Sequence, residues 1–401
     1  MTSSGLDTSR SPIDATEAVA RARALAPQVA ALAAEAEALR RMPPALVEAI
    51  RAAGLVRMLT PRRFGGHELP FDAFIDATIE IARADASMGW CFSFMNIHSW
   101  LLAGFPEQAQ AEVWGPDPDV GIANVNMPVG QVTPVPGGYR LSGSWPWASG
   151  SDHCDVAILA GIVPAAEGSP PGPPDVRLFV VSRPDFTVQD TWRVAGQRGT
   201  GSNNVVVQDA FVPEHRVVPL AELREAQAPG KHVNPGPNYQ LPLLPGLAIS
   251  LVAPIVGAAL GAYDRWRDAT RTRVTTYSRE QVASLSHQQI RMAEVSAELD
   301  CAQLLLRRAL DTLRSADPLT LEQRVRLRRD YAYIATLCVR AVERIYLASG
   351  AAANYESNPL QRQWRDVHAM VAHTGVNFDS AGENFGRMQL GLPLNPKDPL
   401  F

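Results

Sequence analysis

The chain has 401 residues, and its 37 lysines and arginines against 41 aspartates and glutamates give a formal net charge of −4. This balance argues against nucleic acid as the main partner, because binding to phosphates needs a clustered surplus of basic residues. With 46% hydrophobic and 19% charged residues, the composition is typical of a globular protein that buries a sizeable core. The length predicts more than one domain.

The cysteines, the histidines and the N-terminus indicate a cytoplasmic protein without a metal site. No CxxC pair occurs among the four cysteines, which are Cys91, Cys154, Cys301 and Cys338, so neither a disulfide framework nor a cysteine-rich zinc site is expected. The eight histidines form no HExxH motif. The first residues, MTSSGLDTSRSP, lack the basic head and the apolar core of a secretory signal.

Residues 1–118 have the pattern of a helical domain. Alanine and glutamate dominate from Asp14 to Arg41, and the proline pair at 43–44 then ends this helix and starts a second one. Two further helices are predicted over 72–83 and 86–102, where mostly apolar residues surround two phenylalanines and a tryptophan.

Residues 119–225 have the pattern of a β domain, because short β-branched runs alternate with turn residues. Strands are predicted at GIANVNM (121–127), GGYRLSGSW (137–145), VAILAGIV (156–163), VRLFVVS (176–182) and NVVVQDAFV (204–212). The Pro-Gly-Gly run at 136–138 predicts a hairpin turn. Strands at this spacing favour a small antiparallel barrel or sandwich.

Residues 226–401 return to a helical period. Apolar residues that step by three and four predict one buried face at Ile290, Ala293, Ala297, Cys301 and Leu304. A second face is predicted at Leu327, Tyr331, Ile334, Cys338, Val342 and Ile345. Thr320 and Gln323 form a capping box at the start of that helix, Gly350 ends it, and Pro359 begins a last long helix.

The expected fold is therefore α+β, with an N-terminal helical domain, a central small β-barrel or sandwich and a C-terminal four-helix bundle. Residues 241–263 contain no charge and are long enough to span a bilayer. Three prolines and three glycines interrupt this segment, so a buried helix of the bundle is the favoured interpretation.

The common nucleotide and nucleophile motifs are absent. No GxGxxG follows a strand, and neither a P-loop nor a GxSxG nucleophile elbow occurs. Three other segments stand out: GSWPWASGSDHC (143–154), RGTGSNNVVVQDAFVPEHRVV (198–218) and NPLQRQWRDVHAMVAHTGVNFD (358–379). Each also has a plain structural interpretation, as a packed aromatic corner, an ordinary loop and strand, and a helix with core histidines.

In this order and within this α–β–α frame, the three segments resemble the acyl-CoA dehydrogenase superfamily. More narrowly, they resemble its flavin-dependent monooxygenase branch, which includes the oxygenase components of two-component phenol hydroxylases and dibenzothiophene monooxygenase. The resemblance covers nearly the whole chain. It implies a flavin-binding set, which consists of Asn124, Asn126, Trp147, Ser149, Arg198, Thr200, Ser202, Arg271 and Arg273.

The resemblance also implies a role for each member of this set. Trp147 would pack on the flavin ring system, and the hydroxyl of Ser149 would lie near the flavin N5. The two asparagines match positions that bind the pyrimidine edge, and the RGTGS turn at 198–202 would close over the flavin. Arg271 or Arg273 matches an arginine that binds the flavin phosphate, often in a neighbouring subunit, although the family's following Phe-Gly is missing.

The catalytic turn departs from the dehydrogenase pattern. Many dehydrogenases of the superfamily carry a Tyr-Glu-Gly-Thr turn shortly after an Arg-Asp pair, and the glutamate removes the α-proton of the acyl thioester. Counted from the Arg-Asp pair at 365–366, this turn falls on residues 373–375, where Thr374 replaces the glutamate. A threonine hydroxyl is no base near neutral pH. The resemblance thus argues against dehydrogenation and puts the imidazole of His373 in the pocket.

The implied function is that of a reduced-flavin-dependent monooxygenase, the oxygenase component of a two-component system. It would insert one atom of O₂ into an aromatic or heteroaromatic small molecule through a flavin C4a-hydroperoxide, with N5 held by the Ser149 hydroxyl. A phenolic substrate must lose a proton, and a histidine with a pKa near 6.5 suits this step. His373 is the first choice for the base, and His98 is the second because related monooxygenases place a histidine on the matching helix.

The cofactor is expected to be FMNH₂ or FADH₂, with O₂ as co-substrate. A separate NAD(P)H-dependent flavin reductase is expected as partner, because the chain lacks a dinucleotide fingerprint. The wide apolar helix faces predict a homotetramer. Two alternatives remain at this point: an acyl-CoA dehydrogenase-type or amino-sugar N-oxidising flavoenzyme on the same fold, and a binding protein that has lost the flavin.

Overall fold

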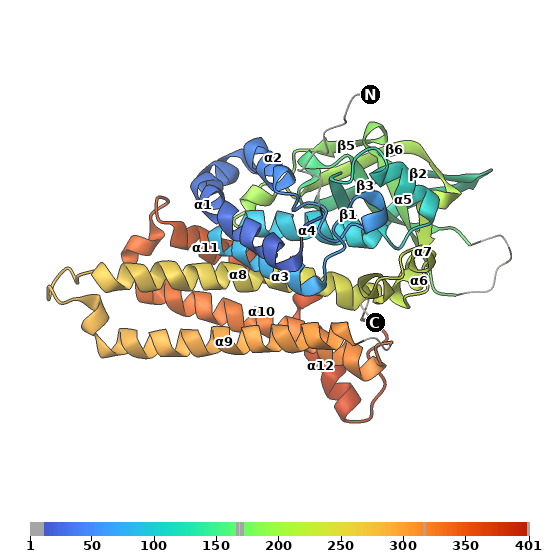
Figure 1. The fold of residues 1–401 in the computed structure, drawn as a ribbon. Helices are drawn as coiled ribbons and strands as arrows, with labels where there is room; N and C mark the ends of the chain where they lie inside the picture. The colour runs from blue at the N-terminus through green and yellow to red at the C-terminus, as the bar shows by residue number, and fades with distance from the viewer. Residues whose placement is uncertain (1–11, 166–167, 169–171, 316–317, 399–401) are drawn as a thin grey trace.

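The computed structural model describes residues 12–165, 168, 172–315 and 318–398, so the outer ends of the first and third predicted domains lie outside the described residues. In Figure 1 the N-terminal helices and a β-sheet lie next to each other, and both stand on a layer of long C-terminal helices. The order of helices, strands and helices confirms the predicted α+β architecture.

The helices before the sheet are α1 (Ala15–Leu39), α2 (Pro44–Ala52), α3 (Phe71–Ala84), α4 (Ala86–Leu102) and α5 (Glu107–Trp114). The first four follow the predicted segments closely. Asp14 caps α1 by accepting the N–H of Glu17, and Asp85 caps α4 by accepting the N–H of Met88. Each cap satisfies one of the N–H groups that a first helical turn leaves unpaired. The eight-residue α5 was not predicted, because it is short and half of its residues are polar.

The middle part is a seven-stranded sheet with the strand order β5-β6-β2-β1-β3-β4-β7. The strands are β1 (Ile122–Val135), β2 (Gly138–Ala148), β3 (Val156–Val163), β4 (Asp175–Ser182), β5 (Phe186–Gln189), β6 (Asn203–Pro213) and β7 (Val217–Pro219). The five predicted runs correspond to β1–β4 and β6. Strands β5 and β7 were not predicted, because four and three residues are too few to show an alternating pattern.

The prediction of an antiparallel barrel or sandwich needs a correction. The strands form one mixed sheet. Strand β1 lies between β2 and β3, and its pairing with β3 is parallel. The β1–β2 hairpin was predicted correctly: Val135 pairs with Gly138, and Gly137 has a φ of 80°. Glycine adopts this left-handed conformation readily because it has no Cβ.

The C-terminal part contains α6 (Leu220–Arg224), α7 (Gly230–Val233), α8 (Leu243–Thr272), α9 (Ser286–Arg314), α10 (Leu321–Ser349), α11 (Pro359–Val371) and α12 (Phe378–Gln389). The predicted capping box at Thr320 and Gln323 is present, and Gly350 ends α10. The last predicted helix is two helices, α11 and α12, separated by the short turn η10 (Thr374–Val376). This break places His373 just beyond the end of α11.

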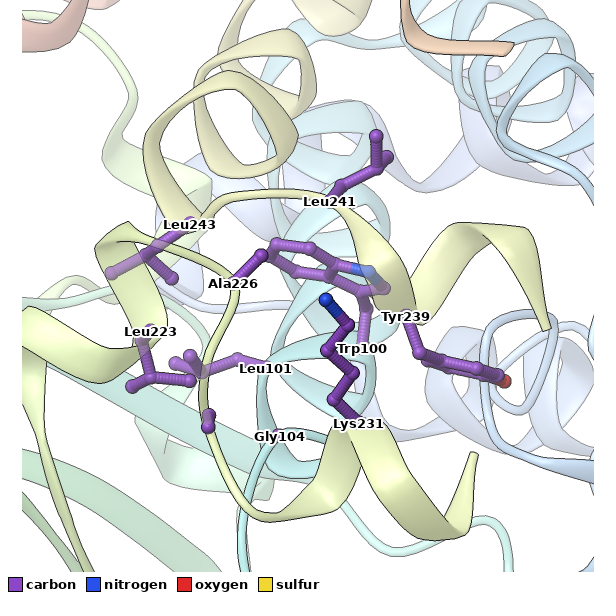
Figure 2. A pocket seen from close by; sticks show the side chains of 10 residues that line it. Trp100, Leu101, Gly104, Leu223, Ala226, Lys231, Tyr239, Leu241 and Leu243 are labelled. Carbon is purple, nitrogen blue, oxygen red and sulfur yellow. The ribbon is translucent and has the colours of Figure 1, made fainter. Parts of the chain in front are cut away.

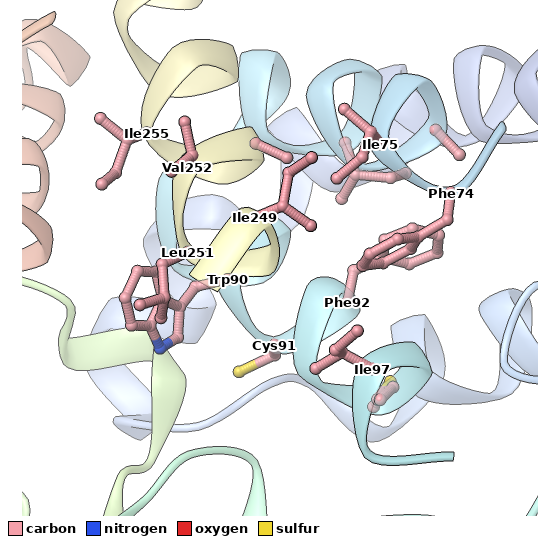
Figure 3. Close-up of a cluster of buried hydrophobic side chains, with 14 of the residues drawn as sticks. Phe74, Ile75, Trp90, Cys91, Phe92, Ile97, Ile249, Leu251, Val252 and Ile255 are labelled. Atoms are coloured by element: carbon pink, nitrogen blue, oxygen red, sulfur yellow. The ribbon is translucent and has the colours of Figure 1, made fainter. Parts of the chain in front are cut away.

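Helix α8 covers most of the uncharged segment 241–263, which is long enough to span a membrane. It is long and apolar enough to cross a membrane, but 78% of its most apolar window is buried inside the protein. Figure 3 shows why: Ile249, Leu251 and Val252 of α8 meet side chains of α3 and α4 in one hydrophobic cluster. The interpretation of this segment as a buried bundle helix is confirmed.

The two predicted helix faces have opposite outcomes. The α10 face is buried from Leu327 to Ile345, as expected. The α9 face was predicted wrongly, since Ile290 is 60% exposed and Leu304 is 70% exposed, while Leu299 and Leu306 on another face are buried. Helix α9 carries apolar residues on two faces, and periodicity alone does not show which of them packs within the chain.

Candidate functional site

The candidate site begins with an aromatic stripe on α4. Trp90, Phe94 and His98 are spaced four residues apart, so they share one face of the helix. The ring centroids of Trp90 and Phe94 are 4.9 Å apart, and those of Phe94 and His98 are 5.1 Å apart. The ring of His373 joins the stripe from the C-terminal part, with its centroid 6.0 Å from that of Trp90. The structure thus brings both predicted histidines to one aromatic wall.

Trp90 connects this wall to the sheet through a row of hydroxyl groups. Its Nε1 donates to the Oγ of Ser149, at 3.1 Å, just beyond the end of β2. The Oγ of Ser149 lies 2.7 Å from the Oγ of Ser202, which lies 2.7 Å from the Oγ1 of Thr200. Thr200 Oγ1 then donates to the backbone carbonyl of Gln197, at 2.8 Å. We call these groups, from Trp90 to the carbonyl of Gln197, the hydroxyl row.

The two ends of the hydroxyl row fix its direction. An indole N–H only donates, a carbonyl only accepts, and each hydroxyl has one proton to give. Because Thr200 gives its proton to Gln197, Ser202 must donate to Thr200, and Ser149 must donate to Ser202. The Ser149 oxygen accepts from Trp90 and retains acceptor capacity. It can therefore receive one more hydrogen bond from a ligand, but it cannot donate one while the row is intact.

Trp147 lies beside this row in an unusual backbone conformation. Its side chain is 64% exposed, and its φ is 65°. The pairing of β2 with β6 is irregular between Trp145 and Ala148, so Trp147 stands outside the regular ladder. A left-handed conformation costs a residue other than glycine about 1–2 kcal/mol, and such strain concentrates at functional sites. The result is a large aromatic surface next to Ser149 that the described chain leaves uncovered.

Asn124 and Asn126 lie on one face of β1 because they are two residues apart. The Nδ2 of Asn124 donates to the Oδ1 of Asn126, at 3.1 Å, and to the carbonyl of Ile158, at 2.9 Å. Within the described residues, this leaves the Oδ1 of Asn124 and the Nδ2 of Asn126 without partners on half-buried side chains. An adjacent acceptor and donor of this kind would suit the edge of a pyrimidine ring, and the flavin contact of the two asparagines stays a prediction.

His98 is fixed in one tautomer. Its Nδ1 lies 2.8 Å from the carbonyl of Ile122, and a carbonyl only accepts, so Nδ1 carries the proton. Burial lowers the pKa of His98 to about 4, which keeps the ring neutral at pH 7. Its Nε2 therefore bears a lone pair and can accept a hydrogen bond or a proton.

His373 has the opposite tautomer. Its Nδ1 accepts the backbone N–H of Gly375, at 3.0 Å, so the proton of the neutral ring is on Nε2. The residue is open to solvent on one side, yet the protein around its ring lowers the pKa of His373 to about 4. The expected pKa near 6.5 is thus wrong for both histidines, because the sequence did not show how far each ring is desolvated.

None of the three predicted arginines belongs to the aromatic wall or to the hydroxyl row. Arg198 begins the short turn η5 (Arg198–Thr200) and lines a narrow recess with acidic side chains of α1, α4 and α11. Arg271 and Arg273 lie at the end of α8, which is the end of the bundle farthest from the sheet in Figure 1. Arg273 donates to the carbonyls of Ala348 and Ser349, and Arg271 is exposed. Flavin contacts of the three arginines stay predictions.

A separate recess lies at the C-terminal end of α4. Figure 2 shows the apolar side chains of Trp100, Leu101, Leu241 and Leu243 around this recess, with the amine of Lys231 next to the indole of Trp100. Its volume of about 30 Å³ holds roughly two water molecules, which is too small for an aromatic ring. None of the predicted site residues lines this recess, so it lies apart from the candidate site.

The comparison with known proteins identifies the family. Residues 14–117 match the acyl-CoA dehydrogenase N-terminal domain, and residues 249–378 match the acyl-CoA dehydrogenase C-terminal domain. The chain belongs to the acyl-CoA dehydrogenase family. Within this family it is an oxidoreductase of the flavin-dependent monooxygenase branch, as its relatives show.

Three of these relatives cover nearly the whole chain. The chain is 37% identical to the oxygenase subunit HsaA of a flavin-dependent monooxygenase from Rhodococcus jostii, over 93% of this chain and 98% of that one. It is 34% identical to the oxygenase component of an FADH₂-dependent resorcinol hydroxylase from Rhizobium sp., over 90% of each chain. The structure of XiaF from Streptomyces sp., in complex with FADH₂ and glycerol, matches with a TM-score of 0.85 at 30% identity, over 95% of this chain and 96% of that one.

Sequence reasoning missed two members of the site. Trp90 was treated as part of an apolar helix, although its spacing to Phe94 and His98 already indicated a common face. Gln197 was not singled out at all, and no local signal marks it, because its role depends on contacts with residues 169 positions away.

The buried His98 should make the fold sensitive to acid. An unfolded histidine has a pKa near 6.5, so protons bind the unfolded chain better, and the stability that neutral His98 contributes is lost as the pH falls from 6.5 toward 4. At pH 4.5 this loss amounts to about 2.5 kcal/mol. His98→Gln keeps a donor for Ile122 without titrating, so it should lose about 2.5 kcal/mol less than wild type between pH 7.5 and 4.5. Denaturant titrations at both pH values measure this; equal losses would contradict it.

Proposed function

We propose that the chain is the oxygenase component of a two-component monooxygenase, which uses reduced flavin and O₂ to hydroxylate an aromatic small molecule. The oxygenase relatives and the FADH₂ in one matching structure support this proposal. Because both named cofactors of these relatives are FADH₂, we favour FADH₂ over FMNH₂. The description of relatives as oxygenase components also supports a separate NAD(P)H-dependent flavin reductase as partner.

The observation that carries the proposal is the acceptor on Ser149, at the head of the hydroxyl row and beside the uncovered indole of Trp147. Reduced flavin carries a hydrogen on N5, so the Ser149 oxygen fits it as an acceptor. Trp147 offers a face for the ring system, and the Asn124 and Asn126 pair offers an acceptor and a donor for the pyrimidine edge. When bound, reduced flavin supplies the two electrons that put one oxygen atom of O₂ into the substrate and the other into water.

The two histidines would have opposite roles: one would accept a proton, and the other would donate a hydrogen bond. The Nε2 of His98 bears a lone pair, so His98 would accept the proton of a phenolic substrate. The Nε2 of His373 bears a hydrogen, so His373 would donate a hydrogen bond to the oxygen that leaves as water. This reverses the ranking in the sequence analysis, where His373 was the first choice for the base.

The aromatic wall and α8 would keep this chemistry dry. Trp90, Phe94 and the apolar side chains of α8 would exclude water from this wall once flavin and substrate are bound. Excluding water matters because activated oxygen that is not transferred leaves as H₂O₂. The dehydrogenase alternative has no support at this turn, since Thr374 occupies the position of the dehydrogenase glutamate.

The proposed function can be tested with the purified chain, reduced FAD or FMN, O₂ and a panel of phenols and heteroaromatic compounds. A product heavier by one oxygen atom is expected with at least one compound. Ser149→Ala should bind reduced flavin within about tenfold of wild type, since one hydrogen bond contributes about 0.5–1.5 kcal/mol, but should release more H₂O₂ per product. Ser144→Ala, an exposed hydroxyl on the same strand, is the control. Unchanged coupling in Ser149→Ala would remove Ser149 from the mechanism.

The histidine roles predict different results for matched glutamine variants. A glutamine side chain donates an N–H but is no base near pH 7. His98→Gln should therefore still consume O₂ with reduced flavin but should form product about 10²–10⁴-fold more slowly, which is typical for loss of a general base. His373→Gln should keep most of the product yield, and His373→Ala should not. Rates of product and H₂O₂ formation distinguish these variants, and a loss of product in His373→Gln but not in His98→Gln would return the base role to His373.

We further propose that a second copy of the chain covers the exposed apolar face of α9, within a homotetramer. The face runs from Ile290 to Leu304, about 21 Å along the helix, and its apolar side chains are exposed. Such a stripe on a helix is more apolar than a soluble monomer usually leaves in water. In such an assembly Arg271, at the distant end of α8, would contact the flavin of a neighbouring chain.

We also propose that the enzyme is cytoplasmic. The four free cysteines, three of them buried, are compatible with this location.

The assembly can be tested by light scattering at micromolar concentration. Wild type should scatter as a tetramer, and Leu304→Glu should form smaller species, because it replaces the most exposed leucine of the apolar face with a charge. Gln303→Glu adds the same charge one position away and should leave the tetramer intact. A stable wild-type monomer would contradict the proposal.

A further inference from the structure

A buried carboxyl group lies behind the candidate site. Asp366 is on α11, seven residues before His373, and is 2% exposed. Its Oδ1 accepts the backbone N–H of Gln197 at 2.6 Å. Its Oδ2 is buried and has no hydrogen-bond partner within the described residues. A buried charged group with an unused oxygen is costly, so its presence at this position calls for an explanation.

The segment that Asp366 holds is packed directly on α11. A Cβ at Gly196 would lie 2.2 Å from the carbonyl oxygen of Arg365, so only glycine permits this approach. The Arg365 guanidinium also donates to the carbonyl of Ala195. Gln197 follows with a φ of 60°, a left-handed conformation that a residue other than glycine keeps only under constraint. Asp366 and Arg365 supply that constraint.

The same residue, Gln197, is the last member of the hydroxyl row. Its carbonyl accepts from the Oγ1 of Thr200 at 2.8 Å and from the Nε1 of Trp192 at 2.8 Å. The contacts therefore form a closed circuit. Asp366 holds Gln197, the hydroxyl row runs from Gln197 to Trp90, Trp90 packs against His373, and α11 leads back from His373 to Asp366.

The charged groups that face Asp366 come from three helices and one turn, namely Glu37 of α1, Asp85 of α4, Arg362 and Arg365 of α11, and Arg198 of η5. Burial, and after it the charge of Asp85, raise the pKa of Asp366 to about 7, against the opposing effects of the Gln197 N–H and the two α11 arginines. The carboxyl group therefore changes its charge near neutral pH.

We propose that Asp366 is a positioning residue that orients Ser149 and His373 together, through its hydrogen bond to the backbone of Gln197. This inference rests on the proposed function, because Ser149 and His373 matter only if they serve the flavin and the substrate. The Arg-Asp pair of α11 would therefore act on the site indirectly, because neither residue contacts Ser149.

The pH sets the strength of this contact. Above pH 7 the carboxylate accepts a charge-assisted hydrogen bond, which is about twice as strong as a neutral one, so the turn at 197–202 is held more firmly. Stability changes in the opposite direction. A carboxyl whose pKa rises on folding favours the folded chain in its protonated form, so its contribution is lost as the pH rises from about 4 to 7. Firmer positioning and lower stability at pH 8 are a combination that a purely structural acid does not produce.

The first test uses the apo protein and the isosteric variant Asp366→Asn, with Asp330→Asn as control. Asp330 is also 2% exposed but lies on α10, where it accepts from Arg308 and Arg329. Hydrogen exchange of the peptide that contains residues 197–202 should be about threefold to tenfold faster in Asp366→Asn and unchanged in the control. The thermal midpoint of Asp366→Asn at pH 8 should be no lower than that of wild type.

The second test measures coupling with reduced flavin and a substrate that wild type hydroxylates. From pH 6 to pH 8, H₂O₂ per product should fall about threefold to tenfold in wild type and should stay at the pH 6 level in Asp366→Asn. Reduced flavin should bind both proteins within about threefold, because Asp366 makes no hydrogen bond to Ser149, Trp147, Asn124 or Asn126.

Each other outcome has a definite meaning. Wild-type exchange and a wild-type pH profile in Asp366→Asn would overturn the positioning role. A lower thermal midpoint at pH 8, with flavin affinity lost to the same degree, would make Asp366 an ordinary structural acid and would also overturn it. If wild type oxygenates no compound while the exchange result holds, the proposed function fails and the contact between Asp366 and the 197–202 turn stands.

Discussion

The hydrogen bond from Trp90 to Ser149 joins the two halves of this protein. On one side of it lies the large helical core of α3, α4 and α8, and on the other lies the smaller core of the sheet. The bond ties the residue after β2 to α4, at the point where the aromatic wall and the hydroxyl row meet. The carbonyl of Gln197 at the other end of the row only accepts, so each hydroxyl donates toward it, and Ser149 faces a ligand as an acceptor. The donor at one end and the acceptor at the other together set the polarity of the site.

The electrostatics of the site follow from desolvation more than from nearby charges. Burial lowers the pKa of His98 to about 4, and the protein packed around the ring of His373 lowers its pKa to about 4 as well, although that residue stays open to solvent on one side. Two neutral imidazoles differ only in which nitrogen carries the proton, and one backbone group decides that in each case: the carbonyl of Ile122 and the N–H of Gly375. The two histidines at this wall are therefore the same residue type, but one offers a hydrogen-bond acceptor and the other offers a donor.

Several elements were predictable because their signals are local. The proline at 44, the capping box at Thr320 and the glycine at 350 act on the first or last turn of their own helices, and each prediction was correct within a few residues. The α9 face was wrong for the converse reason. Ile290 and Leu304 have the same spacing as a buried face, but burial depends on which surface α10 covers, and that is settled between helices. The mixed sheet was not predicted for the same reason, because the parallel pairing of β1 with β3 joins strands that are not neighbours in the sequence.

The sequence by itself determined the order of helices and strands, the family and the residue types of the site, because motifs and caps are read over a few neighbouring positions. It brought Ser149, His98 and His373 to attention, but it ranked the histidines by an ordinary pKa that neither of them has. Only the tertiary structure decided the tautomers, the direction of the hydroxyl row and the contact of Asp366 with Gln197. These depend on atoms up to 169 positions apart in the chain that folding brings to within 2.6 Å, and on the water that folding removes from around them.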